Sequence, residues 1–216
     1  GLKQGGAENA LFRLVSNRNH KIKNTVISIQ GDGVFVEKFK KIGIEVVSLD
    51  LKSRIFFPVA VFKLTKLFKK INPDIIQSWM YHADLLAGIA AFLTKKKIFW
   101  GIVNFNLDTS VIKYSTKFII KLCSFLSYSI PEKIISCSEN AIEAHTDVGY
   151  CRNKFVTIPL GIDIDDFYKN NNKRIFFRNK WGIKTDDIVL GYVARWDPVK
   201  DHDNLLAALN ILVKKI

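Results

Sequence analysis

Short apolar runs alternate with helix-periodic stretches through the first three quarters of the chain. The apolar runs predict strands over residues 24–30, 44–49, 74–79, 97–103, 133–137 and 155–158. The stretches between them carry apolar residues at spacings of three and four, and predict helices over residues 6–18, 34–41, 59–71, 83–93, 113–126 and 139–148. Strands that are apolar on both faces and alternate with helices are typical of a parallel sheet covered by helices. The pattern therefore predicts an α/β fold with a doubly wound parallel sheet.

The pattern changes beyond residue 158. The polar run 169–173 has no periodicity, and a short helical stretch follows near residues 174–181. Further along, the pattern predicts a strand, a loop and an amphipathic helix over residues 187–194, 197–201 and 202–215. We interpret the chain as a Rossmann-like domain, a linker and the start of a second Rossmann-like domain, over residues 1–160, 161–185 and 186–216. Gly1 leads at once into a Gly-rich turn and Ile216 interrupts a helical pattern, so we expect both ends to be cut.

Charge adds a hint about partners. The 33 Lys and Arg exceed the 20 Asp and Glu and leave a net charge of +13. This excess favours anionic partners such as nucleotides, nucleic acid or acidic lipid headgroups. A genome rich in codons for Lys, Asn, Ile and Phe would produce the same excess without any such partner. Apolar residues make up 48% of the chain, enough for a sizeable core, which excludes disordered, collagen-like and disulfide-scaffold classes.

Cysteine usage and hydropathy indicate the compartment. The three cysteines form no CxxC pair and have no His at metal-ligand spacing, so neither a disulfide framework nor a metal site is expected. No apolar stretch approaches the roughly 18 residues that span a bilayer. We expect a cytoplasmic protein. The basic amphipathic stretch 59–71 could also rest on the anionic inner face of the plasma membrane, or simply cover the sheet as other helices do.

Three polar segments are predicted to lie where strands end and helices begin. Gly5 and Gly6, followed by Glu8, allow close backbone approach and favour an anion at a helix N-terminus, although an ordinary turn would look the same. His82 follows the strand 74–79 and could exchange hydrogen bonds with a substrate hydroxyl, or serve as a capping or core residue. Asn104 follows the strand 97–103, where turn chemistry is the alternative.

The loop before the last predicted helix carries two cations. Arg195 and Lys200 are five residues apart beside a helix N-terminus. The planar guanidinium and the ammonium group suit a diphosphate, and they would stabilise charge that develops on a leaving nucleoside diphosphate. A solvated loop with ordinary surface charges is the alternative.

Taken in order, these segments resemble the retaining glycosyltransferases of family 4, which have the two-domain GT-B architecture. The matching segments are Gly5-Gly6-Ala7-Glu8, PDIIQSWMYH at 73–82, Cys137-Ser138-Glu139-Asn140, IPLGID at 158–163 and VARWDPVKDH at 193–202. The fourth is similar to the family's Pro-Asn-Gly-Ile-Asp hinge, with Leu160 in place of Asn. The fifth is similar to its Gly-Arg-Leu-x-x-x-Lys-Gly phosphate loop. Two departures stand out, because Asn104 falls where many members carry His and the family's Glu-x₇-Glu motif is absent.

The resemblance implies an enzyme that moves a sugar from a nucleoside diphosphate sugar to a lipid-linked or polysaccharide acceptor, with no metal and no other cofactor. It assigns the catalytic contacts with the sugar to His82 and Asn104, and the donor diphosphate to Arg195 and Lys200. It makes Gly5, Gly6 and Glu8 a phosphate or acceptor loop, and turns Ser138 and Glu139 toward the interdomain cleft. It also implies a fragment, inactive alone, that lacks the first strand and most of the C-terminal domain.

Two other functions compete with this interpretation. A non-catalytic basic module could bind nucleic acid or an anionic membrane, but the sequence has no RNP-like or helix-turn-helix signature. A dinucleotide-dependent oxidoreductase would need a GxGxxG motif and a ribose-binding acid, and neither is present at the expected spacing. We therefore expect a glycosyltransferase without a nucleic-acid partner.

Overall fold

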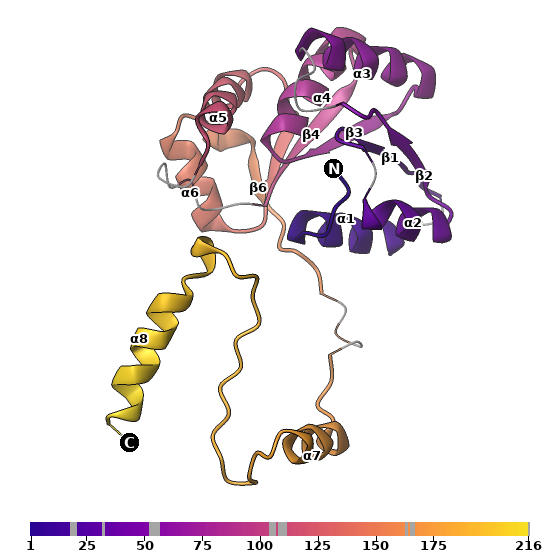
Figure 1. Ribbon diagram of the computed structural model, residues 1–216. Coiled ribbons are helices and arrows are strands. Elements are labelled where there is room, and N and C mark those ends of the chain that lie inside the picture. Colours follow the sequence, from indigo (N-terminus) through magenta and orange to yellow (C-terminus); the bar gives the residue numbers. More distant parts are fainter. Residues whose placement is uncertain are drawn as a thin grey trace. The chain divides into compact units, whose positions relative to one another are not determined.

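The computed structural model describes residues 1–17, 21–31, 33–51, 57–103, 107, 112–162, 164 and 167–215. The chain divides into two compact units, Gly1–Ile162 and Asp163–Ile216, which we call the first and the second unit. Figure 1 shows the helices and strands of both.

The strands of the first unit are all parallel. β1 (Thr25–Ser28) pairs with β2 (Glu45–Ser48) in a two-stranded sheet. A four-stranded sheet has the order β3 (Ile75–Trp79), β4 (Lys97–Ile102), β5 (Lys133–Ser136) and β6 (Phe155–Thr157). The six predicted strands of this region are confirmed, each somewhat shorter at its ends. Parallel neighbours require crossover connections, and helices supply them.

Six α-helices accompany the strands in the part of the first unit that the structure describes. They are α1 (Gly6–Ser16), α2 (Val34–Lys41), α3 (Phe57–Ile71), α4 (Tyr81–Thr94), α5 (Tyr114–Leu126) and α6 (Glu139–Asp147), and a short 3-10 helix, η1 (Arg152–Lys154), precedes β6. α4 packs between α3 and α5, while α1 packs on α2. In Figure 1, α1 and α2 lie on the opposite side of the strands from α3 and α4. Helices therefore cover both faces of the strand layer, as the doubly wound pattern predicts.

The larger core lies between the four-stranded sheet and the helices α3, α4 and α5. Trp100 of β4 is fully buried at its centre, among residues of α3, α4, α5 and the neighbouring strands. The indole lies so close to Gly88 of α4 that a Cβ there would be 3.2 Å from Trp100 Cζ2. Gly88 thus lets the tryptophan fit against the helix, and the close packing fixes α4 on the sheet.

A smaller core joins the start of the chain to α2 and the two-stranded sheet. Leu2, Phe35 and Phe39 are buried in it, with Phe12 packed against them. The backbone N–H of Phe35 donates to the Leu2 carbonyl at 3.2 Å. A Cβ at Gly33 would collide with that same carbonyl, so only glycine fits where the first residues cross the start of α2.

The second unit is helical where it is regular. It contains α7 (Asn171–Lys180), the 3-10 helix η2 (Pro198–Lys200) and α8 (His202–Val213). The predicted helices are confirmed, with α7 starting three residues before the expected position. The predicted loop at 197–201 is partly helical, because η2 occupies its centre.

The predicted strand over residues 187–194 is wrong for this structure. These residues adopt no regular secondary structure, and Ile188 and Val193 are 83% and 101% exposed. A strand needs a neighbour to accept and donate its backbone hydrogen bonds, and none of the described residues pairs with this segment. An apolar run alone is therefore not sufficient. Among the described residues, no helix has the length and hydropathy needed to cross a bilayer.

Candidate functional site

The C-terminal ends of β3 to β6 lie along one edge of the four-stranded sheet, because the four strands are parallel neighbours. In open α/β sheets this is the edge where ligands bind. The ends of β4 and β5 are linked there, because Cys137 Sγ lies 3.8 Å from the Val103 carbonyl. His82 follows β3, and Ser138 and Glu139 follow β5. Asn104, which follows β4 in sequence, lies outside the described residues.

His82 is the second residue of α4, three positions after the last residue of β3. The side chain reaches the surface, and partial desolvation of the imidazole lowers its pKa below the ordinary value. The neutral ring is therefore favoured, and a neutral ring can donate one hydrogen bond and accept another. The position at the sheet edge agrees with the sequence, while the role of His82 as a catalytic residue stays a prediction.

The turn that carries His82 is strained. Met80 lies between β3 and α4 with φ 73° and ψ 155°, a region that is essentially restricted to glycine. Such a conformation costs about 1–3 kcal/mol and persists only where its surroundings enforce it. Here the backbone N–H of Met80 donates to the Gly101 carbonyl at 3.0 Å, which ties the turn to β4.

A buried acid lies directly behind this turn. Asp84 of α4 is fully buried, and Ser78 Oγ of β3 donates to Asp84 Oδ1 at 2.6 Å. Burial raises the pKa of Asp84 well above its ordinary value, since low polarity disfavours the charged form, and hydrogen bonds from Ser78 and the Gly101 backbone only partly oppose this shift. Asp84 Oδ2 is buried without a hydrogen-bond partner. The protonated form is therefore favoured.

Tyr81 extends the buried polar network to α6. The Tyr81 hydroxyl lies 2.8 Å from His145 Nε2, and His145 Nδ1 lies 2.6 Å from the Ala141 carbonyl. A carbonyl only accepts, so Nδ1 carries the proton and Tyr81 donates to Nε2. Burial lowers the pKa of His145, which agrees with this neutral tautomer. The pair joins the first turn of α4 to α6 beneath the sheet edge.

The Gly5-Gly6 turn opens α1, as predicted. Gly5 is the N-cap residue, and Glu8 lies in the first turn of the helix. A methyl group at Gly5 would collide with the Glu8 carboxylate, so this acid folds back over the turn. A carboxylate at a helix N-terminus satisfies the positive end of the dipole itself. The arrangement therefore favours a neutral, hydroxyl-bearing acceptor over a phosphate at this turn, and both roles stay predictions.

Ser138 and Glu139 have structural partners in the first unit. Ser138 is the N-cap of α6, and its hydroxyl accepts the Ala141 N–H at 3.3 Å. Glu139 accepts a hydrogen bond from the Thr157 hydroxyl and pairs with Arg152 at 3.4 Å. These contacts explain why a Ser-Glu pair opens this helix. Their predicted orientation toward an interdomain cleft is not tested by contacts inside one unit.

Arg195 and Lys200 lie in the second unit around η2. The Arg195 side chain is 79% exposed and pairs with Asp197 at 3.5 Å. Lys200 is exposed, while its backbone is fixed, because its N–H donates to the Asp197 carbonyl and its carbonyl accepts the Tyr192 hydroxyl. Arg195 thus precedes the short 3-10 helix η2, and Lys200 is its last residue, just before α8. Their contact with a diphosphate stays a prediction.

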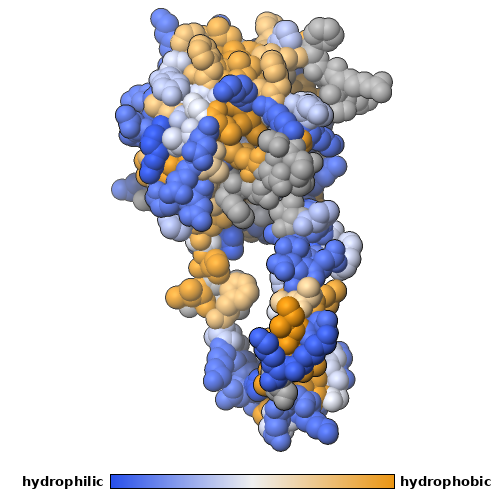
Figure 2. Space-filling view, turned by 90° about the vertical axis from the view of Figure 1, so that its left-hand side faces the viewer, coloured by the Kyte–Doolittle hydropathy of each residue, from blue (hydrophilic) through white to orange (hydrophobic). Residues whose placement is uncertain are grey.

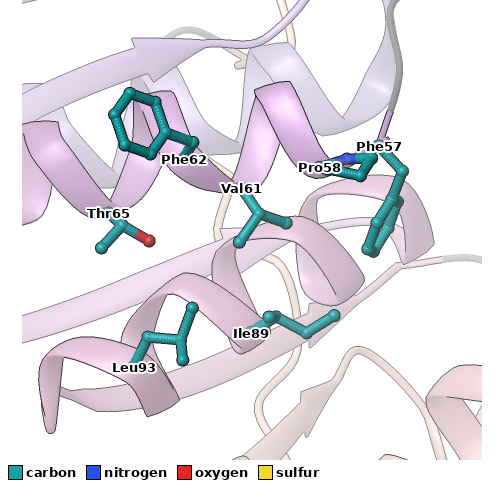
Figure 3. A pocket seen from close by; sticks show the side chains of 7 residues that line it. All are labelled: Phe57, Pro58, Val61, Phe62, Thr65, Ile89 and Leu93. Carbon is teal, nitrogen blue, oxygen red and sulfur yellow. The ribbon is translucent and has the colours of Figure 1, made fainter.

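The outer surface of α3 and α4 is the other notable feature of the first unit. The buried residues of α3 are Ala60, Val61, Leu64 and Phe68, and its lysines are exposed. The predicted inward apolar face of this helix is confirmed, and the helix packs against α4. Between α3 and α4 lies an apolar hollow of about 390 Å³, lined by Phe57, Pro58, Val61, Phe62, Thr65, Ile89 and Leu93 (Figure 3). Apolar colour gathers at this end of the first unit in Figure 2.

A second hollow of about 380 Å³ adjoins the first one. Lys63, Lys66 and Lys70 line it together with Ser48, Leu49, Phe62 and Leu67. Phe62 belongs to both hollows and is 68% exposed. An apolar surface and a cationic surface therefore meet at one aromatic side chain.

The described residues hold no cluster of three or more His, Cys, Asp or Glu side chains that could bind a metal ion. Cys123, Cys137 and Cys151 are free thiols. The expectation that no metal takes part is not tested by this observation.

The residues behind the His82 turn, Ser78 and Asp84, are not among the predicted site residues. Asp84 carries the only charge in the apolar stretch 83–93, and Ser78 precedes it by six residues. This isolated acid was the available signal. No sequence pattern indicated the positive φ of Met80, since methionine rarely adopts it.

Comparisons with known proteins bear on the whole arrangement. The family model described as Glycosyltransferase Family 4 matches residues 4–166. The capsular polysaccharide biosynthesis glycosyltransferase CapM of Staphylococcus aureus is 27% identical over 172 residues, which cover 77% of this chain and 42% of CapM. The match with the family model covers all of the first unit except residues 1–3, and includes the turns that carry His82 and Ser138 and the hinge-like segment 158–163.

Solved structures share the fold. Anabaena Alr3699/HepE, crystallised in complex with UDP, matches with a TM-score of 0.81 and 19% identity over 97% of this chain and 55% of HepE. A glycosyltransferase from Rickettsia africae matches with a TM-score of 0.53 and 19% identity over 75% of this chain and 42% of that protein. The chain thus spans about half the length of these relatives. The predicted α/β fold of GT-B type is confirmed, and the chain belongs to glycosyltransferase family 4.

Proposed function

We propose that this chain is part of a retaining glycosyltransferase that moves a sugar from a nucleoside diphosphate sugar to a lipid-linked or polysaccharide acceptor. The observation that carries the proposal is the family match over residues 4–166. The named relatives support the finer points, because CapM is a capsular polysaccharide biosynthesis enzyme and HepE has been crystallised with UDP and with UDP-glucose. The retaining course follows from the resemblance to family 4. A non-catalytic nucleic-acid module gains no support from these relatives.

In this proposal the first unit binds the acceptor and the second unit begins the donor-binding domain. The predicted linker, residues 161–185, would then form the first part of the second unit and lead to this domain. The sheet edge after β3 and β4 would then carry the groups that contact the sugar, His82 and Asn104. The neutral His82 ring is suited to this role, because it can hold a sugar hydroxyl through a hydrogen bond in either direction.

The chemical step balances without a protein nucleophile. The acceptor hydroxyl oxygen forms a bond to the anomeric carbon on the face from which the diphosphate leaves, the bond from this carbon to the phosphate oxygen breaks, and the hydroxyl proton passes to the leaving phosphate. Arg195 and Lys200 stabilise the charge on the diphosphate, and both side chains are exposed, Arg195 before η2 and Lys200 at its end. We propose that these two cations make a metal ion unnecessary.

The experiment is a turnover assay on the full-length enzyme with Arg195→Ala and Lys200→Ala. Loss of one contact to a developing anion costs roughly 2–4 kcal/mol, so each variant should lose about 30-fold to 1000-fold in kcat. Lys180→Ala, at the end of α7, is a matched control in the same unit and should retain kcat. Activity should survive EDTA. Near-normal turnover in both loop variants, or complete loss in EDTA, would contradict the cationic mechanism.

We further propose that the enzyme docks on an anionic leaflet through α3. The support is the meeting of an apolar hollow with a three-lysine hollow at Phe62, a combination that suits acyl chains beside anionic headgroups. A membrane-bound enzyme would also meet a lipid-linked acceptor without leaving the surface.

Vesicle sedimentation tests this surface on the 216-residue chain. Each lysine near an anionic leaflet contributes about 1 kcal/mol, so combined Lys63→Gln, Lys66→Gln and Lys70→Gln changes should weaken binding to anionic vesicles by roughly 100-fold. The matched control changes Lys38, Lys40 and Lys41 of α2 to Gln, which removes the same charge from another helix. Equal losses of vesicle binding in both triple variants would indicate nonspecific charge attraction and would contradict docking through α3.

A further inference from the structure

The junction between β3 and α4 has a backbone conformation that its own sequence does not favour. Met80 adopts φ 73° and ψ 155°, whereas glycine would adopt these angles without strain. Met80 is also the N-cap residue of α4, yet no side chain accepts a hydrogen bond there as a cap. The usual device for starting a helix is therefore absent at this junction, and something else must hold it.

Three hydrogen bonds surround Met80. Its N–H donates to the Gly101 carbonyl at 3.0 Å, and its own carbonyl accepts the N–H of Asp84 at 2.9 Å. The third bond, from Ser78 Oγ to Asp84 Oδ1 at 2.6 Å, joins the strand before Met80 to the helix after it. Ser78 and Asp84 are both buried, so water does not compete with this bond.

The burial of Asp84 is costly for a purely structural contact. A carboxyl group in this position must remain protonated or lose solvation, and Asp84 Oδ2 has no hydrogen-bond partner. A leucine or alanine would suit the apolar surroundings of α4 better. The residues enclosed by the Ser78–Asp84 bond are Trp79, Met80, Tyr81, His82 and Ala83, and His82 is the exposed titratable group among them.

We propose that the Ser78–Asp84 hydrogen bond and the Met80 turn that it closes are positioning elements, which hold the His82 imidazole in a fixed orientation at the C-terminal edge of β3. Neither Ser78 nor Asp84 contacts substrate in this proposal; both act through His82. The direction of the imidazole toward a donor sugar rests on the proposed function, whereas its fixation by the buried bond does not.

The test follows the His82 ring and the turn backbone by NMR in the 216-residue chain. Labelled histidine and the variant His82→Gln identify the His82 signal among the four histidines. In Ser78→Ala the turn should open, so that the pKa of His82 rises toward its ordinary value and the Asp84 amide exchanges about tenfold faster, as expected for the loss of one hydrogen bond. His145 is hydrogen-bonded to Tyr81 of the same turn, so the reference is His202 of the second unit, whose ring signals should keep their chemical shifts.

Two further variants separate positioning from general stability. Ser124→Ala removes another buried serine hydroxyl, one that bonds only within α5, and should change neither readout. Asp84→Asn keeps an oxygen that accepts the Ser78 hydrogen bond and carries no charge, so it should preserve both readouts. If Ser78→Ala does not fold, Ser78→Cys replaces it, since the thiol keeps the volume but is a weaker donor.

The outcomes are distinct. Unchanged His82 titration and Asp84 exchange in Ser78→Ala, or equal changes in Ser124→Ala, would overturn the proposal, and so would loss of both readouts in Asp84→Asn. In the full-length enzyme, Ser78→Ala should lower kcat more than it raises KM, and Asp84→Asn should retain kcat. If His82→Gln retains normal turnover while the NMR changes occur as expected, the proposed function of His82 fails and its fixation stands.

Discussion

The β3–α4 junction and the segment 187–202 start from the same kind of sequence. Each has an apolar run, then a polar turn, then a helix, and each carries residues that were assigned to the reaction. In the first unit the apolar run forms strand β3, which pairs with β4. The turn after it is held by the hydrogen bond from the Met80 N–H to the Gly101 carbonyl of β4. In the second unit the run stays irregular and its apolar side chains are exposed.

The difference shows what an apolar run needs to become a strand. β3 pairs with β4 over Ile75 to Trp79, and α4 covers one face of it. Residues 187–194 have no such partner among the described residues. A site at a strand end therefore inherits its rigidity from the neighbouring strands, and the Met80 turn could not be held without Gly101 of β4.

The largest expected difference between the two regions is in amide exchange. The backbone amides of β4 are hydrogen-bonded in the sheet, while those of residues 188–194 have no regular partner. Exchange should be on the order of 1000-fold slower in β4 than in residues 188–194, as measured by hydrogen–deuterium exchange of the 216-residue chain. Comparable protection in both segments would show that the second segment pairs after all.

Tryptophan substitutions should produce the next largest difference. Trp100 is fully buried, whereas Trp196 is 84% exposed. Trp100→Ala should lower the free energy of unfolding by about 3–5 kcal/mol, because it leaves a large cavity beside Gly88. Trp196→Ala should change it by less than about 0.5 kcal/mol. Urea unfolding followed by circular dichroism measures both free energies. Similar losses for the two variants would contradict the prediction that only Trp100 is important for stability.

Removal of the Tyr81 hydroxyl should have a smaller effect. In Tyr81→Phe the buried His145 Nε2 loses its donor, which costs about 1–3 kcal/mol in the free energy of unfolding. Tyr192→Phe in the second unit is the matched control, since that hydroxyl donates in an exposed place. If the two variants lose the same free energy of unfolding, the buried Tyr81–His145 hydrogen bond contributes no more to stability than the exposed one of Tyr192.

The pH dependence from His145 should be the smallest effect. Burial lowers the pKa of His145 in the folded chain, so the unfolded chain binds a proton first as the pH falls below about 6.5. This contribution destabilises the folded chain as the pH falls through that value toward the folded-state pKa, and is bounded at about 1.4 kcal/mol per pH unit. The stability difference between the wild type and His145→Asn should therefore shrink from pH 7 to pH 5.

The control for this measurement is His202→Asn, which removes a histidine from the second unit. A wild-type-minus-His145→Asn difference that does not change with pH would contradict the prediction. Urea midpoints at several pH values in one buffer series provide the data, with the slope of each transition checked for constancy.

Sequence periodicity predicted the elements of the first unit well, because its strands and helices bury one another and the apolar pattern records that burial. It could not reveal that no described residue pairs with residues 187–194, since pairing is a non-local property. His82 was found because strand ends are visible in the pattern. Asp84 was overlooked, because its burial depends on Ser78 and Gly101, which come close only in the folded sheet.

The burial of Trp100 also makes tryptophan fluorescence differ between the two units. Trp181 and Trp196 belong to the second unit and are mostly exposed, so iodide can quench their fluorescence. The first unit holds the half-buried Trp79 and the enclosed Trp100. In Trp79→Phe the emission that survives the quencher should therefore come from Trp100, should be blue-shifted, and should become quenchable only when α4 leaves the sheet. A single cuvette experiment can thus report on the first unit while ligands or variants alter the other one.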